Sequence, residues 1–261
     1  MRHLATARLE INGSSPTADQ LRAVALNGYG HFTAMQVRNR RVRGLDLHLG
    51  RLTSATAELF GTELDGGLVT ERIRHALGPD IADASVRVYV QRPVPEEPPT
   101  IMVIVRPPAE MSAEFSLQSV PYQRSVAHIK HLGDFGQHYY GALAERNGFG
   151  EALLTGPDGL ISEGSMTNVG FFDATGVVWP AAAMLHGITM QVLQRELARQ
   201  SVPSRYSQVR LADLGSFASV FVCNSRGIAA VSRVDDMRLD LDADWMKLLA
   251  GSYESAHWDQ T

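Results

Sequence analysis

The feature that most constrains the fold is a near-continuous apolar run at residues 100–106, which Pro107-Pro108 follows directly. The run is rich in β-branched residues and predicts a strand that is buried on both faces of a sheet. Proline has no backbone N–H to offer a sheet, so the strand must end there. Residues 107–113 are therefore the predicted domain boundary. The chain is expected to form an N-terminal domain, 1–110, and a C-terminal domain, 111–261.

Apolar spacing predicts several helices and many short strands. The clearest helix covers residues 46–60, where apolar side chains recur every three or four positions, with Asp46 as the N-cap and Gly61 at the end. Other helices are expected at 70–77, 136–147, 188–200 and 242–257, with a short capped turn at 17–21. Further strands are expected at 5–11, 31–37, 42–45, 84–91, 115–120, 151–155, 160–162, 168–173, 177–179, 219–224 and 228–231.

Turn sequences join three pairs of these strands into predicted hairpins. The first connects residues 31–37 to 42–45 through Asn39-Arg40-Arg41. The second turns at Pro157-Asp158-Gly159 and the third at Ala174-Thr175-Gly176. Such closely spaced hairpins in the second half indicate a domain that is built mainly from sheet.

Composition excludes several function classes. The chain has 261 residues, 44% of them hydrophobic and 20% charged, which is typical of a globular protein with a core. A net charge of −4 gives no general attraction to nucleic acid or to an anionic membrane. The one cysteine, Cys223, excludes an internal disulfide and a Cys-based metal site, and favours a cytoplasmic setting. We expect no signal peptide and no membrane span.

Lys130 and Glu163 are the pair on which the functional prediction depends. Lys130 lies in the apolar-flanked segment His128-Ile129-Lys130-His131-Leu132, and Glu163 follows a predicted strand. Their separation in sequence allows them to come from different elements and face one pocket. A lysine and a carboxylate on opposite sides of a pocket suit pyridoxal 5'-phosphate (PLP). The lysine forms the Schiff base, and the carboxylate pairs with the protonated pyridine nitrogen.

Five blocks of sequence, in this order along the chain, resemble the class IV aminotransferase family of PLP-dependent enzymes. This family includes branched-chain aminotransferases, D-amino-acid aminotransferases and aminodeoxychorismate lyases. The blocks are His48-Leu49-Gly50-Arg51-Leu52, Ile129-Lys130-His131-Leu132, Glu151-Ala152-Leu153-Leu154, Glu163-Gly164-Ser165-Met166-Thr167-Asn168 and Leu185-His186-Gly187-Ile188-Thr189. The resemblance implies an α/β (α+β) fold of type IV, with a small N-terminal α/β sandwich domain and a larger C-terminal pseudo-barrel domain. It also implies a homodimer, with PLP bound in the cleft between the domains.

The resemblance implies a role for each site residue. Lys130 would be the catalytic amine, which apolar neighbours keep uncharged, and Glu163 would pair with the ring nitrogen. Ile188 and Thr189 open a helix whose free N–H groups and dipole suit the cofactor phosphate, and Arg51 would clamp that phosphate. The second phosphate-side turn would be formed by Asn224 and Ser225.

The substrate is left open because each subgroup of the family lacks a feature here. Branched-chain members carry a tyrosine at the position of Phe135, and D-amino-acid aminotransferases carry a histidine that Gln91-Arg92-Pro93 lacks. The threonine that the lyases use for proton transfer falls at Ala34. The candidate substrate residues are Phe32, Arg92 and Arg226.

Three functions follow as hypotheses. The first is amino transfer between an amino acid and a 2-oxo acid, the second is pyruvate elimination from aminodeoxychorismate, and the third is a non-catalytic relative with the same fold. The partners would be small molecules, with neither nucleic acid nor membrane. We expect no metal, because no carboxylate joins His128, His131 and His138 at ligand spacing.

Overall fold

The structure, a computed structural model, describes residues 8–261, so the part of the predicted first strand at residues 5–7 lies outside the described residues. The chain forms two compact units. Unit 1 contains residues up to 109 together with 129–133 and 257–261, and unit 2 contains 110–128 and 134–256. The segment with Lys130 therefore groups with unit 1, whereas the sequence suggested that the C-terminal domain carries this lysine.

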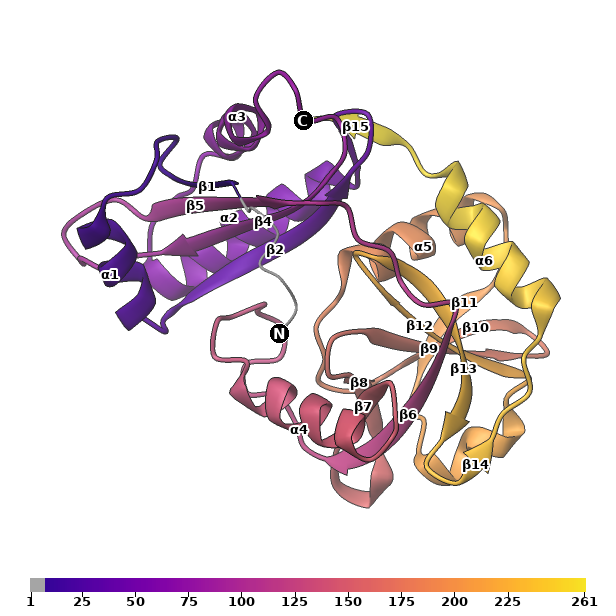
Figure 1. The fold of residues 1–261 in the computed structure, drawn as a ribbon. Helices are drawn as coiled ribbons and strands as arrows, with labels where there is room; N and C mark the ends of the chain where they lie inside the picture. Colours follow the sequence, from indigo (N-terminus) through magenta and orange to yellow (C-terminus); the bar gives the residue numbers. More distant parts are fainter. Residues whose placement is uncertain (1–7) are drawn as a thin grey trace. The chain divides into compact units, whose positions relative to one another are not determined.

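Unit 1 is built on a four-stranded antiparallel sheet with the order β1-β5-β4-β2 (Figure 1). β4 and β5 have the bounds that the alternating and continuous apolar patterns predict. The four strands are β1 (Arg8–Ile11), β2 (Gly30–Val37), β4 (Ala84–Gln91) and β5 (Thr100–Arg106).

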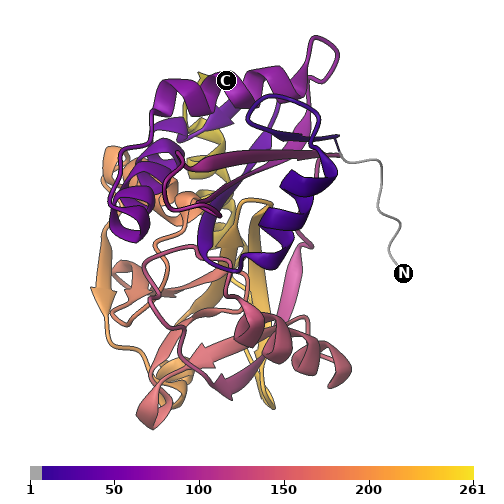
Figure 2. The same cartoon turned by 90° about the vertical axis from the view of Figure 1, so that its left-hand side faces the viewer.

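Two helices bury the core of unit 1 against this sheet. α2 (Leu45–Phe60) packs on β2, and α3 (Gly66–Leu77) packs on β5 (Figure 2). Leu52 of α2 and Ile73 of α3 are fully buried among the apolar side chains of β2, β4 and β5. A third helix, α1 (Ala18–Leu26), begins with a capping box at Thr17, as the capped turn predicted.

The start of α2 corrects one sequence prediction, and the hairpin before it has a partner strand that was not predicted. Gly44, in the left-handed region at φ 67°, is the N-cap in place of Asp46. The Asp259 carboxylate accepts a 3.0 Å hydrogen bond from the N–H of Leu45, so the helix begins earlier than predicted. β3 (Arg41–Arg43) follows β2 through a tight turn that the Arg38–Arg41 bridge closes, as the predicted hairpin requires, and it also pairs with β15 (Trp258–Gln260).

Unit 2 is a mixed, curled sheet with the order β11-β10-β9-β12-β13-β6-β7-β8, and β14 pairs with β13. The sheet is curled, as shown by the contacts that β8, at the end of this order, makes with β9 and β10. The predicted hairpins β7–β8 and β9–β10 are confirmed. The strands are β6 (Glu114–Pro121), β7 (Glu151–Thr155), β8 (Ile161–Gly164), β9 (Asn168–Asp173), β10 (Gly176–Pro180), β11 (Ser204–Ser207), β12 (Ser219–Asn224), β13 (Gly227–Val234) and β14 (Met237–Arg238).

Three helices cover the sheet of unit 2. α4 (Phe135–Arg146) packs on β7, while α5 (Ile188–Arg199) and α6 (Ala243–Ser255) lie side by side (Figure 1). The core beneath α5 and α6 is aromatic, because Phe172, Trp179 and Phe221 are all fully buried there. Unit 2 thus places the beginning of α5 next to the ends of β8 and β12, where the predicted cofactor residues lie.

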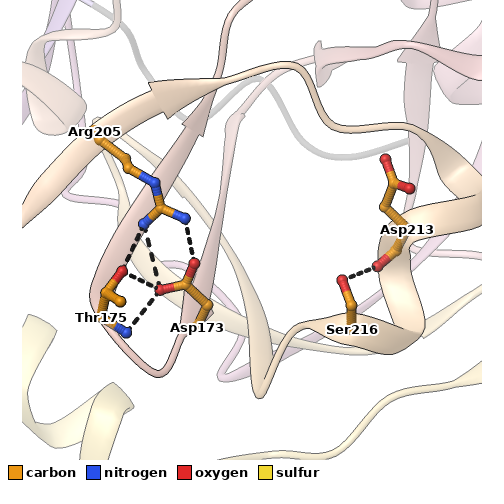
Figure 3. Close-up of polar contacts among 5 residues, drawn as sticks. All are labelled: Asp173, Thr175, Arg205, Asp213 and Ser216. Carbon is orange, nitrogen blue, oxygen red and sulfur yellow. Dashed lines mark hydrogen bonds and ion pairs between the residues drawn. The ribbon is translucent and has the colours of Figure 1, made fainter.

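A polar cluster fixes the edge of the unit 2 sheet (Figure 3). The Arg205 guanidinium on β11 forms an ion pair with Asp173 at the end of β9 and donates a 2.8 Å hydrogen bond to the Thr175 hydroxyl. These contacts hold the pKa of Asp173 below its usual range. Figure 3 also shows Ser216, which donates a 2.6 Å hydrogen bond to the carbonyl of Asp213 within a short 3-10 helix, Leu211–Ser216. Within residues 8–261, no helix has the length and apolarity required to cross a bilayer.

Candidate active site

Lys130 lies beside β2 in unit 1. The Lys130 carbonyl accepts a 2.9 Å hydrogen bond from the N–H of Phe32, and the Leu132 N–H donates to the carbonyl of Gly30 at 2.9 Å. These bonds hold the segment 130–132 like a short extra strand. The Lys130 ammonium lies 4.8 Å from the centre of the Phe32 ring, which stacks on Tyr89. An aromatic face stabilises an ammonium and also gives an amine a partly apolar setting. Lys130 itself is half-buried.

Two buried histidines connect β2 to α2, the helix that carries Arg51. The Thr33 hydroxyl lies 2.6 Å from Nδ1 of His48, and the Thr56 hydroxyl lies 3.0 Å from Nε2 of His31. Burial, together with the positive charge of Arg51, lowers the pKa of His48 to about 3. Burial lowers the pKa of His31 to about 4. Both rings are therefore neutral at pH 7, and they fix the helix face on which half-buried Arg51 lies.

Arg92, one of the predicted substrate residues, is engaged by the backbone of unit 1. Its Nε donates to the carbonyl of Glu97 at 2.9 Å, and its Nη1 donates to the carbonyl of Phe60 at 3.0 Å. The guanidinium thus joins the end of α2 to the loop that follows β4. A substrate carboxylate that binds Arg92 would compete with these two backbone carbonyls for the guanidinium.

Glu163 is a buried carboxylate at the end of β8 in unit 2, with 4% of its surface exposed. Its Oε2 accepts a 3.2 Å hydrogen bond from the N–H of Leu185, and its Oε1 lies 3.4 Å from Nη1 of Arg124. Arg124 is also buried, so the ion pair is shielded from solvent. A buried carboxylate of this kind stays charged only with partners such as these. Glu163 can therefore present a negative charge to a cationic ring nitrogen.

The first turn of α5 provides the features of an anion site. Gly187 is its N-cap and offers no side chain to the first N–H groups of the helix, and Ile188 and Thr189 follow it. A side chain at position 187 would collide with Asn168, whose amide donates a 2.6 Å hydrogen bond to the carbonyl of Leu185. A helix start with uncapped N–H groups binds phosphate readily.

The turn after β12 lies next to this helix start. The Thr189 hydroxyl donates a 2.8 Å hydrogen bond to the carbonyl of Asn224. The Asn224 side chain in turn accepts a 2.8 Å hydrogen bond from the N–H of Arg226 and donates to the carbonyl of Met166. Ser225 is half-buried and Arg226 is exposed. The predicted residues Thr189 and Asn224 are thus brought together, with Ser225 and Arg226 following in the same turn.

Two buried charged residues of unit 2 have contacts that sequence reasoning did not foresee: Arg124 was not singled out, and Glu151 opens one of the five family-like blocks but was given no role. Arg124 lies in an irregular segment between β6 and α4, where its only signal is an isolated arginine shortly before Lys130. Glu151 is the single charged residue of the fully buried strand β7, a pattern that signals a buried carboxylate with a specific task. Burial raises the pKa of Glu151 to about 7, against the opposing effect of hydrogen bonds from Met166, Thr167 and Ser165.

His138, Cys223 and Phe135, which the sequence also singled out, differ in their exposure. His138 is exposed on α4 and contacts Asp134 at 3.2 Å. Among residues 8–261, no group of three or more histidine, cysteine or acidic residues is arranged to hold a metal ion. Cys223 is fully buried on β12, and burial raises the pKa of its thiol. Phe135, which stands where branched-chain members carry a tyrosine, is 80% exposed.

Comparison with known protein families shows which class of enzyme has this fold and these residues. A family profile described as amino-transferase class IV matches residues 30–234. This chain belongs to the class IV aminotransferase family. Comparison with curated protein sequences finds no match.

Solved structures share the fold over most of their length. A hypothetical aminotransferase from Mycobacterium tuberculosis, in its apo form, is 21% identical, with 96% of this chain and 98% of that chain covered and a TM-score of 0.84. A branched-chain aminotransferase from the archaeon Thermoproteus uzoniensis, with norvaline, is 16% identical, with coverage of 94% and 93% and a TM-score of 0.80. A provisionally named 4-amino-4-deoxychorismate lyase from Legionella pneumophila is 15% identical, with coverage of 85% and 89% and a TM-score of 0.78. The fold is therefore the fold of the type IV enzymes, as the sequence predicted.

Proposed function

We propose that the protein is a PLP-dependent aminotransferase that moves an amino group between an amino acid and a 2-oxo acid. The observation that carries the proposal is the class IV match over residues 30–234, which contains both Lys130 and Glu163. In support, the Mycobacterium tuberculosis protein has also been solved in a PLP-bound form and in a form with α-ketoglutarate and PMP. Bound PLP would supply an electron sink for negative charge that develops at the substrate α-carbon.

The residues of this chain fit such a cofactor in charge and in hydrogen-bonding capacity. Glu163 offers a buried carboxylate to the ring nitrogen, and Ile188 and Thr189 offer helix N–H groups to the phosphate. Arg51 is proposed as a further phosphate ligand, and Asn224 and Ser225 as the second turn at the phosphate. We propose that one cofactor molecule contacts these residues and Lys130.

Lys130 is proposed to hold the cofactor covalently and then to move the proton of the substrate α-carbon. An amine suits both tasks, because it attacks a carbonyl in its neutral form and then acts as a base. The chain has two lysines, Lys130 and Lys247, and Lys247 is exposed on α6. Only Lys130 lies in a segment that is tied to the sheet of unit 1 and flanked by the buried Ile129.

Elimination of pyruvate from aminodeoxychorismate is the second candidate. Its support is the fold shared with the Legionella pneumophila protein and the lyase-like residues Gly30-His31-Phe32-Thr33 and Cys223-Asn224-Ser225. Against it, Ala34 stands where the lyases use a threonine, so a proton donor of the lyases is missing. Amino transfer needs only the lysine as a proton carrier, and for this reason we place it first.

One experiment separates these activities. Purified protein with PLP is offered a panel of L- and D-amino acids, and amino transfer is read from the change in the cofactor absorption and from the 2-oxo acid formed. Aminodeoxychorismate is offered separately without an amino acceptor. We expect a response to at least one amino acid and no pyruvate from aminodeoxychorismate. Pyruvate release alone would establish the lyase instead, and a protein that binds PLP but turns over neither substrate would be a non-catalytic relative.

The assembly and the substrate contacts complete the proposal. We propose a cytoplasmic homodimer, which sedimentation equilibrium would test by the mass of the particle. Phe32, which contacts Lys130, and Arg226, which is exposed beside Asn224, are proposed to contact the substrate, the arginine through a carboxylate. Arg92 remains a third candidate for that contact.

A further inference from the structure

The turn of residues 164–167 connects Glu163 to β9. The Gly164 N–H donates a 2.9 Å hydrogen bond to the carbonyl of Thr167, which closes the turn, and the Ser165 N–H donates at 2.9 Å to the carbonyl of Ala152 on β7. A side chain at position 164 would have its first carbon 2.6 Å from Oε1 of Glu151. The turn is therefore packed directly against the Glu151 carboxylate.

One oxygen of Glu151 receives three hydrogen bonds from this turn. Oε1 accepts from the N–H of Met166 at 2.5 Å, from the Thr167 hydroxyl at 3.1 Å and from the Ser165 hydroxyl at 3.4 Å. Glu151 is buried, so no bulk water replaces these donors. A carboxylate that gathers three donors from three consecutive residues sets the conformation of all of them.

Met166 connects Glu151 to Asn224, which belongs to the proposed phosphate site. Its N–H bonds to Glu151, and its carbonyl accepts a 3.3 Å hydrogen bond from the amide of Asn224. The Asn224 carbonyl accepts from the Thr189 hydroxyl in the first turn of α5. A continuous route thus leads from Glu151 through Met166 and Asn224 to the proposed phosphate site.

The other end of the turn leads to the proposed ring site. Asn168, directly after the turn, binds the carbonyl of Leu185, and the Leu185 N–H binds Glu163. Glu163 itself immediately precedes the turn. Glu151 therefore holds the one segment that both halves of the candidate site share.

We propose that Glu151 is a positioning residue of the cofactor site, which fixes the turn 164–167 so that Glu163 and the Asn224–Thr189 pair hold their places together. This inference rests on the proposed function, since it assumes that these residues bind the cofactor. Glu151 acts through the turn and does not itself touch the cofactor. The sequence analysis included Glu151 in a family-like block but gave it no role.

The test compares Glu151→Met, which keeps the length of the side chain and removes its acceptor oxygens, with Glu151→Gln, which keeps one oxygen. PLP affinity is measured by fluorescence titration of the apo protein. We expect Glu151→Met to weaken PLP binding roughly ten-fold or more and Glu151→Gln to restore most of that loss. Glu196→Met is the matched control, because Glu196 is a buried glutamate near the far end of α5 whose partner is Arg199. We expect that control to bind PLP like the wild type.

Two further readouts distinguish positioning from general loss of stability. Hydrogen exchange of the Met166 amide, measured without cofactor, should be faster in Glu151→Met and unchanged in Glu196→Met. The losses in PLP affinity from Glu151→Met and Asn224→Ala should not add in the double variant, because both act through Met166. If Glu151→Met does not fold, Thr167→Val removes one donor and should shift affinity and Met166 exchange in the same direction by less.

The outcomes separate this inference from the proposed function. Wild-type protein that does not bind PLP would overturn the proposed function, and this inference with it. Wild-type protein that binds PLP, alongside a folded Glu151→Met variant with unchanged affinity and unchanged Met166 exchange, would overturn the positioning role alone. Additive losses with Asn224→Ala would also overturn it, since the two residues would then act separately.

Discussion

The Thr189 hydroxyl donates a 2.8 Å hydrogen bond to the carbonyl of Asn224 and thereby ties the first turn of α5 to the end of β12. Because the proton of this hydroxyl is occupied in that bond, we propose that the Thr189 side chain serves an anion site by holding the helix start in place. The phosphate would then depend on the N–H groups of the helix.

Substitution of Thr189 tests this arrangement. We expect Thr189→Val to weaken PLP binding by roughly five- to ten-fold, because the Asn224 carbonyl loses its donor and the helix start is less fixed. Thr189→Ser keeps the hydroxyl and should bind PLP within about two-fold of the wild type. Equilibrium titration followed by absorbance gives both values, and equal affinities for the valine and serine variants would contradict the anchoring role.

The buried pair of Arg124 and Glu163 predicts a change in stability. Arg124→Met removes the guanidinium whose Nη1 lies 3.4 Å from Oε1 of Glu163. We expect the free energy of unfolding of the apo protein to fall by about 2–3 kcal/mol at pH 7. Urea unfolding measures it, and Arg226→Met serves as the control because Arg226 is exposed. An equal, small loss in both variants would show that the pair adds nothing.

The neutral histidines of unit 1 predict a loss of stability in acid. The folded-state pKa values of His31 and His48 lie at about 4 and 3, below the unfolded value near 6.5. The unfolded chain therefore binds more protons between these values. Stability is fully present above pH 6.5 and falls as the pH drops towards 4, by at most about 1.4 kcal/mol per pH unit for each histidine.

Substitution of His48 isolates this effect. His48→Gln can still meet the Thr33 hydroxyl but cannot take up a proton, so the slope of unfolding free energy against pH should be shallower between pH 6.5 and 4. His257→Gln provides the control, since His257 is exposed. Chemical denaturation at a series of pH values gives the slopes. A slope that His48→Gln leaves unchanged would mean that His48 is not the titrating group.

The cluster in Figure 3 predicts a smaller effect at the sheet edge. Arg205 lowers the pKa of Asp173, so this carboxylate contributes stability above its unfolded pKa near 3.9 and loses that contribution as the pH falls below it. Asp173→Asn should cost about 0.5–1 kcal/mol at pH 7, because the pair is partly exposed. The difference from the wild type should shrink towards pH 2, whereas exposed Asp236→Asn should have little effect at any pH. A cost that is the same at pH 2 and pH 7 would contradict the ionic origin.

Local sequence patterns predicted the elements that depend on local chemistry. β4 and β5 have their predicted bounds because alternation and a proline stop are properties of the strand itself. α3 begins at Gly66, four residues before the predicted start. The sequence pattern missed this first turn because two glycines are unfavourable in a helix, although Asp65 caps it. The pairing of β3 with β15 was not predictable, since it joins residues that are far apart in the sequence, such as Arg43 and Trp258.

The residues of the candidate site likewise fall into those that local sequence motifs indicate and those that only contacts across the fold reveal. Motif residues such as Glu163 and Thr189 could be predicted, because their residue types and spacing carry the resemblance. The contacts of Arg124 and Glu151 could not be predicted, although Glu151 opens a family-like block, because they cross the fold. Arg124 reaches Glu163 from a loop, and Glu151 reaches the turn 164–167 from a neighbouring strand. The grouping of Lys130 with unit 1 likewise depends on two backbone hydrogen bonds to β2.

The most direct test of the account is borohydride reduction of the protein with PLP, followed by peptide mapping. The chain offers two lysine side chains, Lys130 and exposed Lys247, so the map has a built-in comparison. We predict stable attachment of the cofactor to Lys130 and none in Lys130→Arg. A label on Lys247, or on neither lysine in protein that is saturated with PLP, would contradict the proposed function.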